Sequence, residues 1–177
     1  MFNRPLIPAI FVAAAVLCGL GAWVLAEHPD FAAMKRTVRS RFPEVAQLST
    51  GELAAWLGDP QRPPPILLDV RTEKEFAVSH LRGAMRVEPS AKAEEVLARL
   101  PAGRPVVAYC SVGYRSSALA ERLKKVGVGA VYNLEGSIFQ WANEGRPLEA
   151  DGHPADKVHP YNGKFGKMLD EKKRAEP

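Results

Sequence analysis

Short runs of apolar residues alternate along this sequence with segments in which apolar residues recur at helical spacing. Runs of this length, bounded by turn residues, are typical of strands that are buried in a sheet. The expected strands lie at 45–48, at 66–68 running into Asp69, just after Met85, at 106–109 and at 130–132. Strands that alternate with helices predict an α/β fold, with a central parallel five-stranded sheet covered by helices on both faces.

Capping signals indicate where several of the intervening helices begin and end. Ser49 is followed three residues later by Glu52, and Thr72 by Glu75, which is the spacing of a capping box. We therefore interpret Glu75 as a helix cap and not as a catalyst. Further helices are expected over 93–100, from the serines after Arg115 to 126, and from Gly136 onward.

The central apolar run, 106–109, leads directly into Cys110, and helical spacing resumes a few residues later. A cysteine at this position lies over a helix N-terminus, where backbone N–H groups and the helix dipole stabilise a thiolate or a bound anion. Arg115 offers a planar donor fork for an oxyanion, and Ser116 and Ser117 are expected to be the N-caps of the helix. We expect Cys110 to face solvent as a nucleophile. The alternative is that it is a small buried apolar residue.

This stretch resembles the active-site loop of the rhodanese, or thiosulfate sulfurtransferase, domain family. Four residues separate Cys110 from Arg115, and the other segments that carry the resemblance occur in the family's order. They are Leu67, Leu68, Asp69, Val70 and Arg71; Glu75 and Phe76; Ser79, His80, Leu81, Arg82, Gly83 and Ala84; and Leu134, Glu135, Gly136, Ser137 and Ile138, followed by Trp141 and Gly145.

The resemblance implies a rhodanese-like fold and a sulfurtransferase that moves sulfane sulfur from a donor such as thiosulfate or a persulfide to a thiol or cyanide. Cys110 would carry the sulfur as a persulfide. The substrate-binding loop would consist of Ser111, Val112, Gly113, Tyr114, Arg115 and Ser116, with Arg115 orienting an anionic donor. Asp69 and Arg71 would form a supporting charge network, which we interpret as a structural ion pair. No cofactor and no metal are implied, and the partners would be small sulfur donors and thiol acceptors.

Two alternatives share the fold that this resemblance implies. Phosphatases and arsenate reductases of this fold have a longer loop between cysteine and arginine, and non-catalytic binding modules typically lack the cysteine. A basic residue often found within the loop of thiosulfate enzymes is absent, because Ser111, Val112 and Tyr114 are uncharged. Thiosulfate is therefore expected to be a poor substrate.

We do not expect His80 to act as a general base, since a histidine at a helix end is usually structural.

The length of 177 residues suits one domain with extensions, and the net charge of +4 lies mainly in the flanks. Residues 48–150 contain 13 basic and 12 acidic residues. A nucleic-acid-binding face would need a basic stripe on the domain itself, so nucleic acid is not expected as a partner. Two cysteines, one of them within the apolar N-terminal run, exclude a disulfide inside the domain.

Residues 6–26, which start at Leu6 and end at Ala26, contain no charged residue. About 20 such residues can span a bilayer as a helix, so residues 1–27 are expected to be a single-pass membrane anchor or a signal peptide. The anchor would place the protein at a bacterial-type inner membrane. Cleavage of a signal peptide would make it periplasmic. The side of the membrane and the oligomeric state stay open.

Two flanking segments surround the expected domain, which spans 47–150. Residues 28–46 are expected to be a juxtamembrane connector, with Phe31, Met34 and Val38 on one helical face; it would lie on an anionic bilayer surface or in solvent. A chain starting near Arg39 should then be soluble and active. Residues 151–177 are expected to be a basic, solvated tail. His153 lacks neighbours at metal-ligand spacing, which argues against a metal site there.

Overall fold

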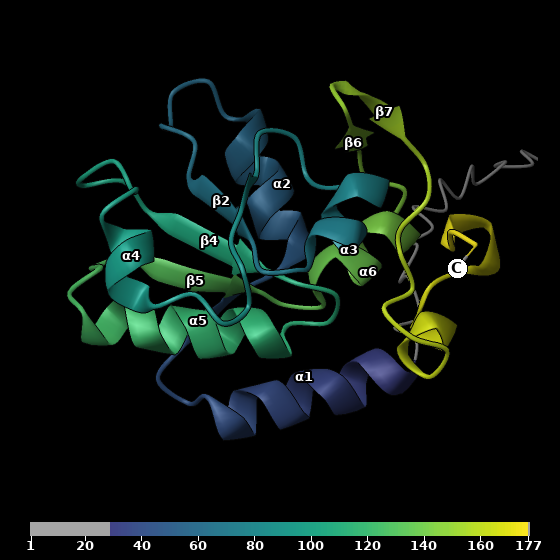
Figure 1. Ribbon diagram of the computed structural model, residues 1–177, viewed down its shortest axis with the longest axis horizontal. Helices are drawn as coiled ribbons and strands as arrows, with labels where there is room; N and C mark the ends of the chain where they lie inside the picture. The colour runs from purple at the N-terminus through teal and green to yellow at the C-terminus, as the bar shows by residue number, and fades with distance from the viewer. Residues whose placement is uncertain (1–28, 177) are drawn as a thin grey trace, which may run out of the picture.

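The computed structural model describes residues 29–176, and the sheet lies between two layers of helices (Figure 1). The helices are α1 Pro29–Arg41, α2 Thr50–Gly58, α3 Glu73–Val78, α4 Ala93–Leu97, α5 Tyr114–Lys125 and α6 Ser137–Asn143, with 3-10 helices η1 Phe165–Met168 and η2 Glu171–Lys173. The strands are β1 Ala46–Leu48, β2 Ile66–Asp69, β3 Met85–Arg86, β4 Val106–Tyr109, β5 Val131–Leu134, β6 Leu148–Ala150 and β7 His153–Ala155.

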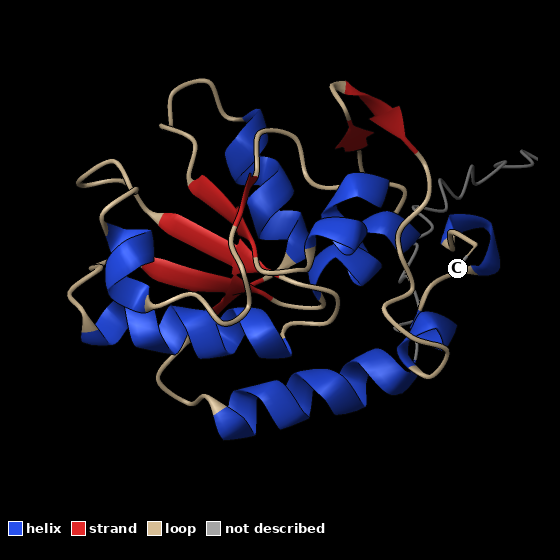
Figure 2. Ribbon diagram, viewed as in Figure 1, coloured by secondary structure: helices blue, strands red, loops and turns tan. Residues whose placement is uncertain are grey.

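The central sheet confirms the predicted architecture. Its five strands have the order β1-β5-β4-β2-β3, and every neighbouring pair is parallel. Strand β4 lies in the middle, where Tyr109 is in register with Asp69 of β2. A separate antiparallel hairpin, β6–β7, follows α6 and was not predicted (Figure 2).

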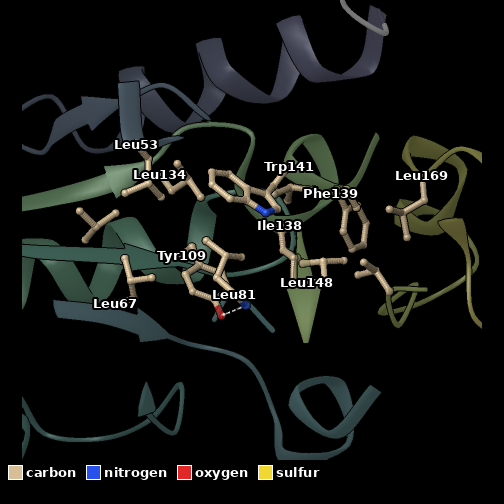
Figure 3. Close-up of a cluster of buried hydrophobic side chains, with 14 of the residues drawn as sticks. Leu53, Leu67, Leu81, Tyr109, Leu134, Ile138, Phe139, Trp141, Leu148 and Leu169 are labelled. Carbon is tan, nitrogen blue, oxygen red and sulfur yellow. Dashed lines mark hydrogen bonds between the residues drawn. The ribbon is translucent and has the colours of Figure 1, made fainter. Parts of the chain in front are cut away.

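Successive residues of the buried strands face opposite sides of the sheet, as the two-residue period of a strand requires. Leu67, Val107 and Tyr109 belong to one apolar cluster, together with buried side chains of α2 and α6 (Figure 3). Leu68 and Ala108 belong to the other, together with side chains of α1, α4 and α5. Both faces of the sheet are therefore covered, which explains why the strands read as continuous apolar runs.

Helix α1 packs on the domain, so the interpretation of residues 28–46 as a surface-lying or solvated connector is wrong for the described part. Phe31, Val38 and Phe42 are buried in the core clusters. Arg39 Nε lies 2.6 Å from Glu135 Oε1 in an ion pair at the domain surface. The apolar face noted in the sequence covers the protein itself because α1 lies across the face of the sheet that carries α5 (Figure 1).

The segment after β7 is also folded, and the prediction of a solvated tail is wrong. Val158, Met168 and Leu169 are buried. Val158 forms backbone hydrogen bonds with the last residues of the segment, as donor to Lys173 O and as acceptor from Ala175 N. The packed unit therefore extends beyond the predicted boundaries of 47 and 150.

Within residues 29–176 no helix has the length and apolar character needed to cross a bilayer. The predicted anchor or signal peptide, residues 1–27, lies outside the described residues.

Candidate active site

Cys110 follows the last residue of β4, at the carboxyl edge of the sheet, and helix α5 begins four residues later. This strand, loop and helix are arranged as predicted. The Cys110 side chain is not solvent-facing, however, because the residue is only 1% exposed. It is a free thiol. The Gly113 N–H donates to Cys110 Sγ at 3.2 Å. The backbone N–H of the residue that immediately precedes α5 therefore points at the sulfur.

The tight turn at Gly113 requires glycine for two reasons. Its φ of 101° lies in the left-handed region that residues with a side chain rarely adopt. A Cβ atom here would also come within 3.2 Å of Asn133 Nδ2. Gly113 is the N-cap of α5, so the prediction that Ser116 and Ser117 cap the helix is wrong. Both serines lie buried in its first turns.

Asn133 and Ser137 support the loop from β5 and from the start of α6. Ser116 Oγ donates to Asn133 Oδ1 at 2.6 Å, and Cys110 N donates to Ser137 Oγ at 3.1 Å. The first turn of α6 also donates to the loop, from Ile138 N to the carbonyl of Cys110, at 3.2 Å. The loop backbone is therefore held by the start of α6, and the first turn of α5 is held by β5. Sequence reasoning missed both polar supports, although Ser137 stood within the family motif.

Arg115 has a different partner from the one that the sequence suggested. Its Nη1 donates to Glu75 Oε2 at 2.9 Å and its Nη2 to Glu75 Oε1 at 2.7 Å. Nη2 also donates to Ser111 Oγ at 2.9 Å, and that hydroxyl donates in turn to Glu75 Oε1. The donor fork that was expected to face an anionic substrate is thus occupied by a carboxylate of the protein.

Glu75 also caps α3, as predicted. Its Oε2 accepts from Thr72 N at 3.0 Å, and Thr72 Oγ1 accepts from Glu75 N. Burial tends to raise the pKa of Glu75, but hydrogen bonds from Arg115 and Thr72 and the positive charge of Arg115 lower it to about 2. Burial lowers the pKa of Arg115, but the hydrogen bonds and the negative charge of Glu75 help to raise it above its ordinary value. Glu75 therefore carries its charge at neutral pH, and its role in the site is one that we did not predict.

The electrostatic surroundings of Cys110 favour the thiolate. Burial raises the pKa of the thiol, but the positive charge of Arg115 and hydrogen bonds from the loop outweigh it, so the pKa lies below the ordinary value. A depressed pKa increases the fraction of nucleophilic thiolate near neutral pH. The geometry thus meets the first requirement for a cysteine nucleophile.

Asp69 and Arg71 form a fully buried pair beside this loop and do not line the cavity at Cys110. Arg71 Nη2 donates to Asp69 Oδ2 at 2.6 Å and also to Ser79 O, just after α3. This agrees with their interpretation as a structural ion pair near a helix end. His80 is structural as well, since its ring stacks on Phe76 at 3.8 Å and its Nε2 lies 3.6 Å from Glu149 Oε1.

A cavity of about 150 Å³ opens beside the sulfur. It is lined by the loop residues Cys110, Ser111, Val112, Tyr114 and Arg115, and by Tyr161 and Phe165 of the C-terminal segment. The two aromatic residues were missed. Nothing in the sequence linked them to Cys110, because they lie about 50 residues away in a segment interpreted as a solvated tail.

Comparison with known proteins by sequence and by structure gives matches to the same family. The family model described as "Rhodanese-like domain" matches residues 49–144. A probable adenylyltransferase/sulfurtransferase MoeZ of Mycobacterium tuberculosis is 29% identical over 70% of this chain, and the match covers 31% of that protein. A sulfurtransferase of Allochromatium vinosum is 32% identical over 60% of this chain and 96% of its own length.

Among solved structures, a rhodanese-like domain protein from Staphylococcus aureus is 26% identical and superimposes with a TM-score of 0.53. The match covers 61% of this chain and all of that chain. The match thus covers less than a third of MoeZ but nearly all of the Allochromatium vinosum and Staphylococcus aureus proteins. In each comparison the part of this chain that extends beyond the match is substantial.

Proposed function

Because the chain belongs to the rhodanese-like domain family, we propose that it is a sulfurtransferase that carries sulfane sulfur on Cys110. The observation that supports this most directly is the geometry at the sulfur. A buried thiol with a lowered pKa accepts a hydrogen bond from Gly113 N, at the N-terminus of α5. Such a position suits a cysteine that must be anionic as a thiolate before the first step and again after the second.

The proposed reaction has two displacement steps. The Cys110 thiolate attacks the outer sulfur of the donor, the bond between that sulfur and the donor breaks, and the donor leaves with the electron pair. An acceptor, either a thiolate or cyanide, then attacks the outer sulfur of the Cys110 persulfide and releases the Cys110 thiolate. No external oxidant or reductant is needed, and the low pKa of Cys110 makes it a good leaving group in the second step.

Arg115 and Ser111 would position the loop and hold a positive charge near the sulfur. The hydrogen bonds to Glu75 and Ser111 hold the guanidinium beside the sulfur, where its positive charge lowers the pKa of the thiol. The donor is bound by the walls of the cavity beside the loop. Asp69 and Arg71 would support the fold at the same sheet edge and take no part in the reaction.

A steady-state assay tests this proposal. With a sulfane donor and cyanide, thiocyanate should form with parallel-line, ping-pong kinetics, and Cys110→Ser should form none above background. Hydrolysis of p-nitrophenyl phosphate should be negligible, because four residues between Cys110 and Arg115 make a loop too small for a tetrahedral phosphate. Efficient phosphate hydrolysis without sulfur transfer would favour the phosphatase alternative. Sulfur transfer by a folded Cys110→Ser protein would exclude the proposed nucleophile.

We also propose that the uncharged residues 6–26 attach the protein to a bacterial-type inner membrane. This rests on the sequence alone, because a charge-free run of that length suits a spanning helix. The native protein should sediment with membranes and resist extraction by high salt. Recovery of a soluble protein that begins near Glu27 would instead identify a signal peptide and a periplasmic protein.

A further inference from the structure

The C-terminal segment, residues 156–176, is anchored beside the active site by specific contacts. Ser79 Oγ donates to Lys157 O at 2.6 Å, and Asn143 Nδ2 donates to Met168 O at 2.8 Å. Asn143 Oδ1 also accepts from Asp170 N. Leu169 is 2% exposed within the main apolar cluster (Figure 3). The segment therefore has a defined position, and so do the side chains that it places at the cavity.

Two aromatic side chains of this segment form one wall of the cavity. The Tyr161 and Phe165 rings pack edge to face, with centroids 5.8 Å apart. The turn that carries them is held by Asn162 Oδ1, which accepts from Lys164 N and Phe165 N at 3.0 Å each. Tyr161 is 45% exposed and has a φ of 63°, a conformation that disfavours residues with a side chain. An exposed aromatic ring held in this way is available for contact with a ligand.

The cavity carries no unpaired positive charge among the described residues that line it. Arg115 is the one basic residue in this lining, and its guanidinium is paired with Glu75 through two hydrogen bonds. The Tyr161 ring covers the guanidinium as well, at 4.8 Å from Cζ to the ring centroid. An anion with two charges, such as thiosulfate, would find no unpaired cation among these residues to offset its desolvation.

Apart from Ser111, whose hydroxyl donates to Glu75, and Cys110 itself, the remaining lining is apolar or aromatic. The size of the cavity suits a small organic group. Val112, Tyr114, Tyr161 and Phe165 face the space beside Cys110. A volume of about 150 Å³ is comparable to the engineered protein cavity that binds benzene. Burial of an apolar group in this space is favourable, whereas burial of an oxyanion is not.

From these observations we propose that Tyr161 and Phe165 are specificity-determining residues that select organic sulfane-sulfur donors over inorganic thiosulfate. The preferred donors have a leaving group with a small apolar substituent, either alkyl or aryl. The inference rests on the proposed sulfur transfer through Cys110 and adds its substrate class. It also gives the C-terminal segment, which lies outside the matched family region of 49–144, a role in the reaction.

Thiosulfonates provide matched probes, because they differ from thiosulfate by one substituent on the inner sulfur. With benzenethiosulfonate, the Cys110 thiolate attacks the outer sulfur, the S–S bond breaks, and benzenesulfinate leaves with the electron pair. With thiosulfate the same step releases sulfite. The charge and the number of electrons balance in both cases, and the Cys110 persulfide is the common product.

The experiment compares kcat/KM for benzenethiosulfonate, methanethiosulfonate and thiosulfate, with cyanide as acceptor. The full chain should prefer them in that order. Phe165→Ala and Tyr161→Gly should each lower the ratio of kcat/KM for benzenethiosulfonate to kcat/KM for thiosulfate by about 10-fold. This is the scale of a lost apolar contact in a pocket. Glycine accepts the φ of residue 161, so this variant should fold. Leu57→Ala, which removes an exposed apolar side chain that does not line the cavity, should leave the ratio unchanged.

A binding measurement removes the dependence on turnover. Calorimetry of Cys110→Ser should show benzenesulfinate binding more tightly than sulfite, and the addition of Tyr161→Gly should weaken benzenesulfinate binding by about 10-fold. If the wild type uses all donors but prefers thiosulfate, or if neither wall variant changes the ratio, the specificity inference is overturned and the sulfurtransferase proposal stands. If no donor yields a persulfide, both are overturned.

Discussion

Glu75 shows how much of the site depends on a single carboxylate. It caps α3 through Thr72, binds both ends of the Arg115 guanidinium, and accepts from Ser111 beside Cys110. The pair keeps a positive charge close to the thiol while leaving that charge largely compensated. The thiol pKa therefore depends on the balance between Arg115 and Glu75.

Opposite substitutions of this pair should shift the thiol pKa in opposite directions. Arg115→Gln removes the stabilising positive charge and should raise the Cys110 pKa by about 1 unit. Glu75→Gln leaves the charge of Arg115 uncompensated and should lower it. The pH dependence of Cys110 alkylation by iodoacetamide measures both shifts. A common direction for the two variants would show that the pair acts by holding the loop in shape.

The pH dependence of stability follows from the lowered pKa of Glu75. Its folded pKa, about 2, lies below its ordinary value of 4.5. The charged form of Glu75 therefore contributes its full stabilisation when the pH is above its ordinary pKa of 4.5, and this stabilisation is lost as the pH falls toward 2. Allowing for screening by solvent, we expect a loss of about 2 kcal/mol in this interval. Urea unfolding from pH 6 to pH 2 should show a flatter profile in Glu75→Gln than in Glu94→Gln, which changes an exposed glutamate.

At the scale of elements, the site forms where four segments meet. β4 delivers Cys110, α5 directs its N-terminus at the sulfur, the first turn of α6 binds the loop carbonyls, and the C-terminal segment closes one wall of the cavity. Only the first two of these relations are local in sequence. The other two depend on how distant parts of the chain pack.

A buried side chain of the C-terminal segment provides a test of this arrangement. Leu169→Ala should lower the free energy of unfolding by about 3 kcal/mol, because the residue lies in the main apolar cluster. Lys172→Ala, three residues away and exposed, should change it by less than about 0.5 kcal/mol. Equal, small effects of the two substitutions in thermal or urea unfolding would support a solvated tail instead.

The distinction between contacts that are local in sequence and contacts between distant parts of the chain explains what could be predicted from the sequence. The five strands of the central sheet, both capping boxes and the place of Cys110 between β4 and α5 depend on periodicity and on neighbouring residues, and they were predicted correctly. The N-cap was placed wrongly because the serines after Arg115 resemble caps, whereas Gly113, with its left-handed φ, takes that position. The contacts of Arg115 with Glu75 and Tyr161 join residues 40 and 46 positions apart, and no local pattern records them.

At the scale of the whole molecule, α1 joins the core to the active-site loop. Phe31 and Val38 are buried in the two apolar clusters on either side of the sheet. Phe42, just after α1, packs edge to face on Tyr114 with centroids 5.2 Å apart. Tyr114 lines the cavity. The residue that follows α1 therefore contacts the cavity lining, although it precedes the matched family region.

This packing changes the expected behaviour of shortened chains. A chain that starts at Pro29 should keep the stability of the folded unit. A chain that starts at Arg39, which we expected from the sequence to be soluble and active, loses Phe31 and Val38 from the core and should be less stable by about 4 kcal/mol. Urea unfolding of the two chains measures the difference. Equal stability would show that α1 contributes little to the core.

Intact-protein mass spectrometry after exposure to a sulfane donor tests the central claim most directly. The wild-type protein should gain the mass of one sulfur atom, fragmentation should place it on Cys110, and cyanide should remove it with release of thiocyanate. Cys110→Ser, which should stay folded because its hydroxyl can accept from Gly113 N, should gain nothing. Absence of the added sulfur from the wild type with thiosulfate, thiosulfonate and organic persulfide donors alike would contradict the account.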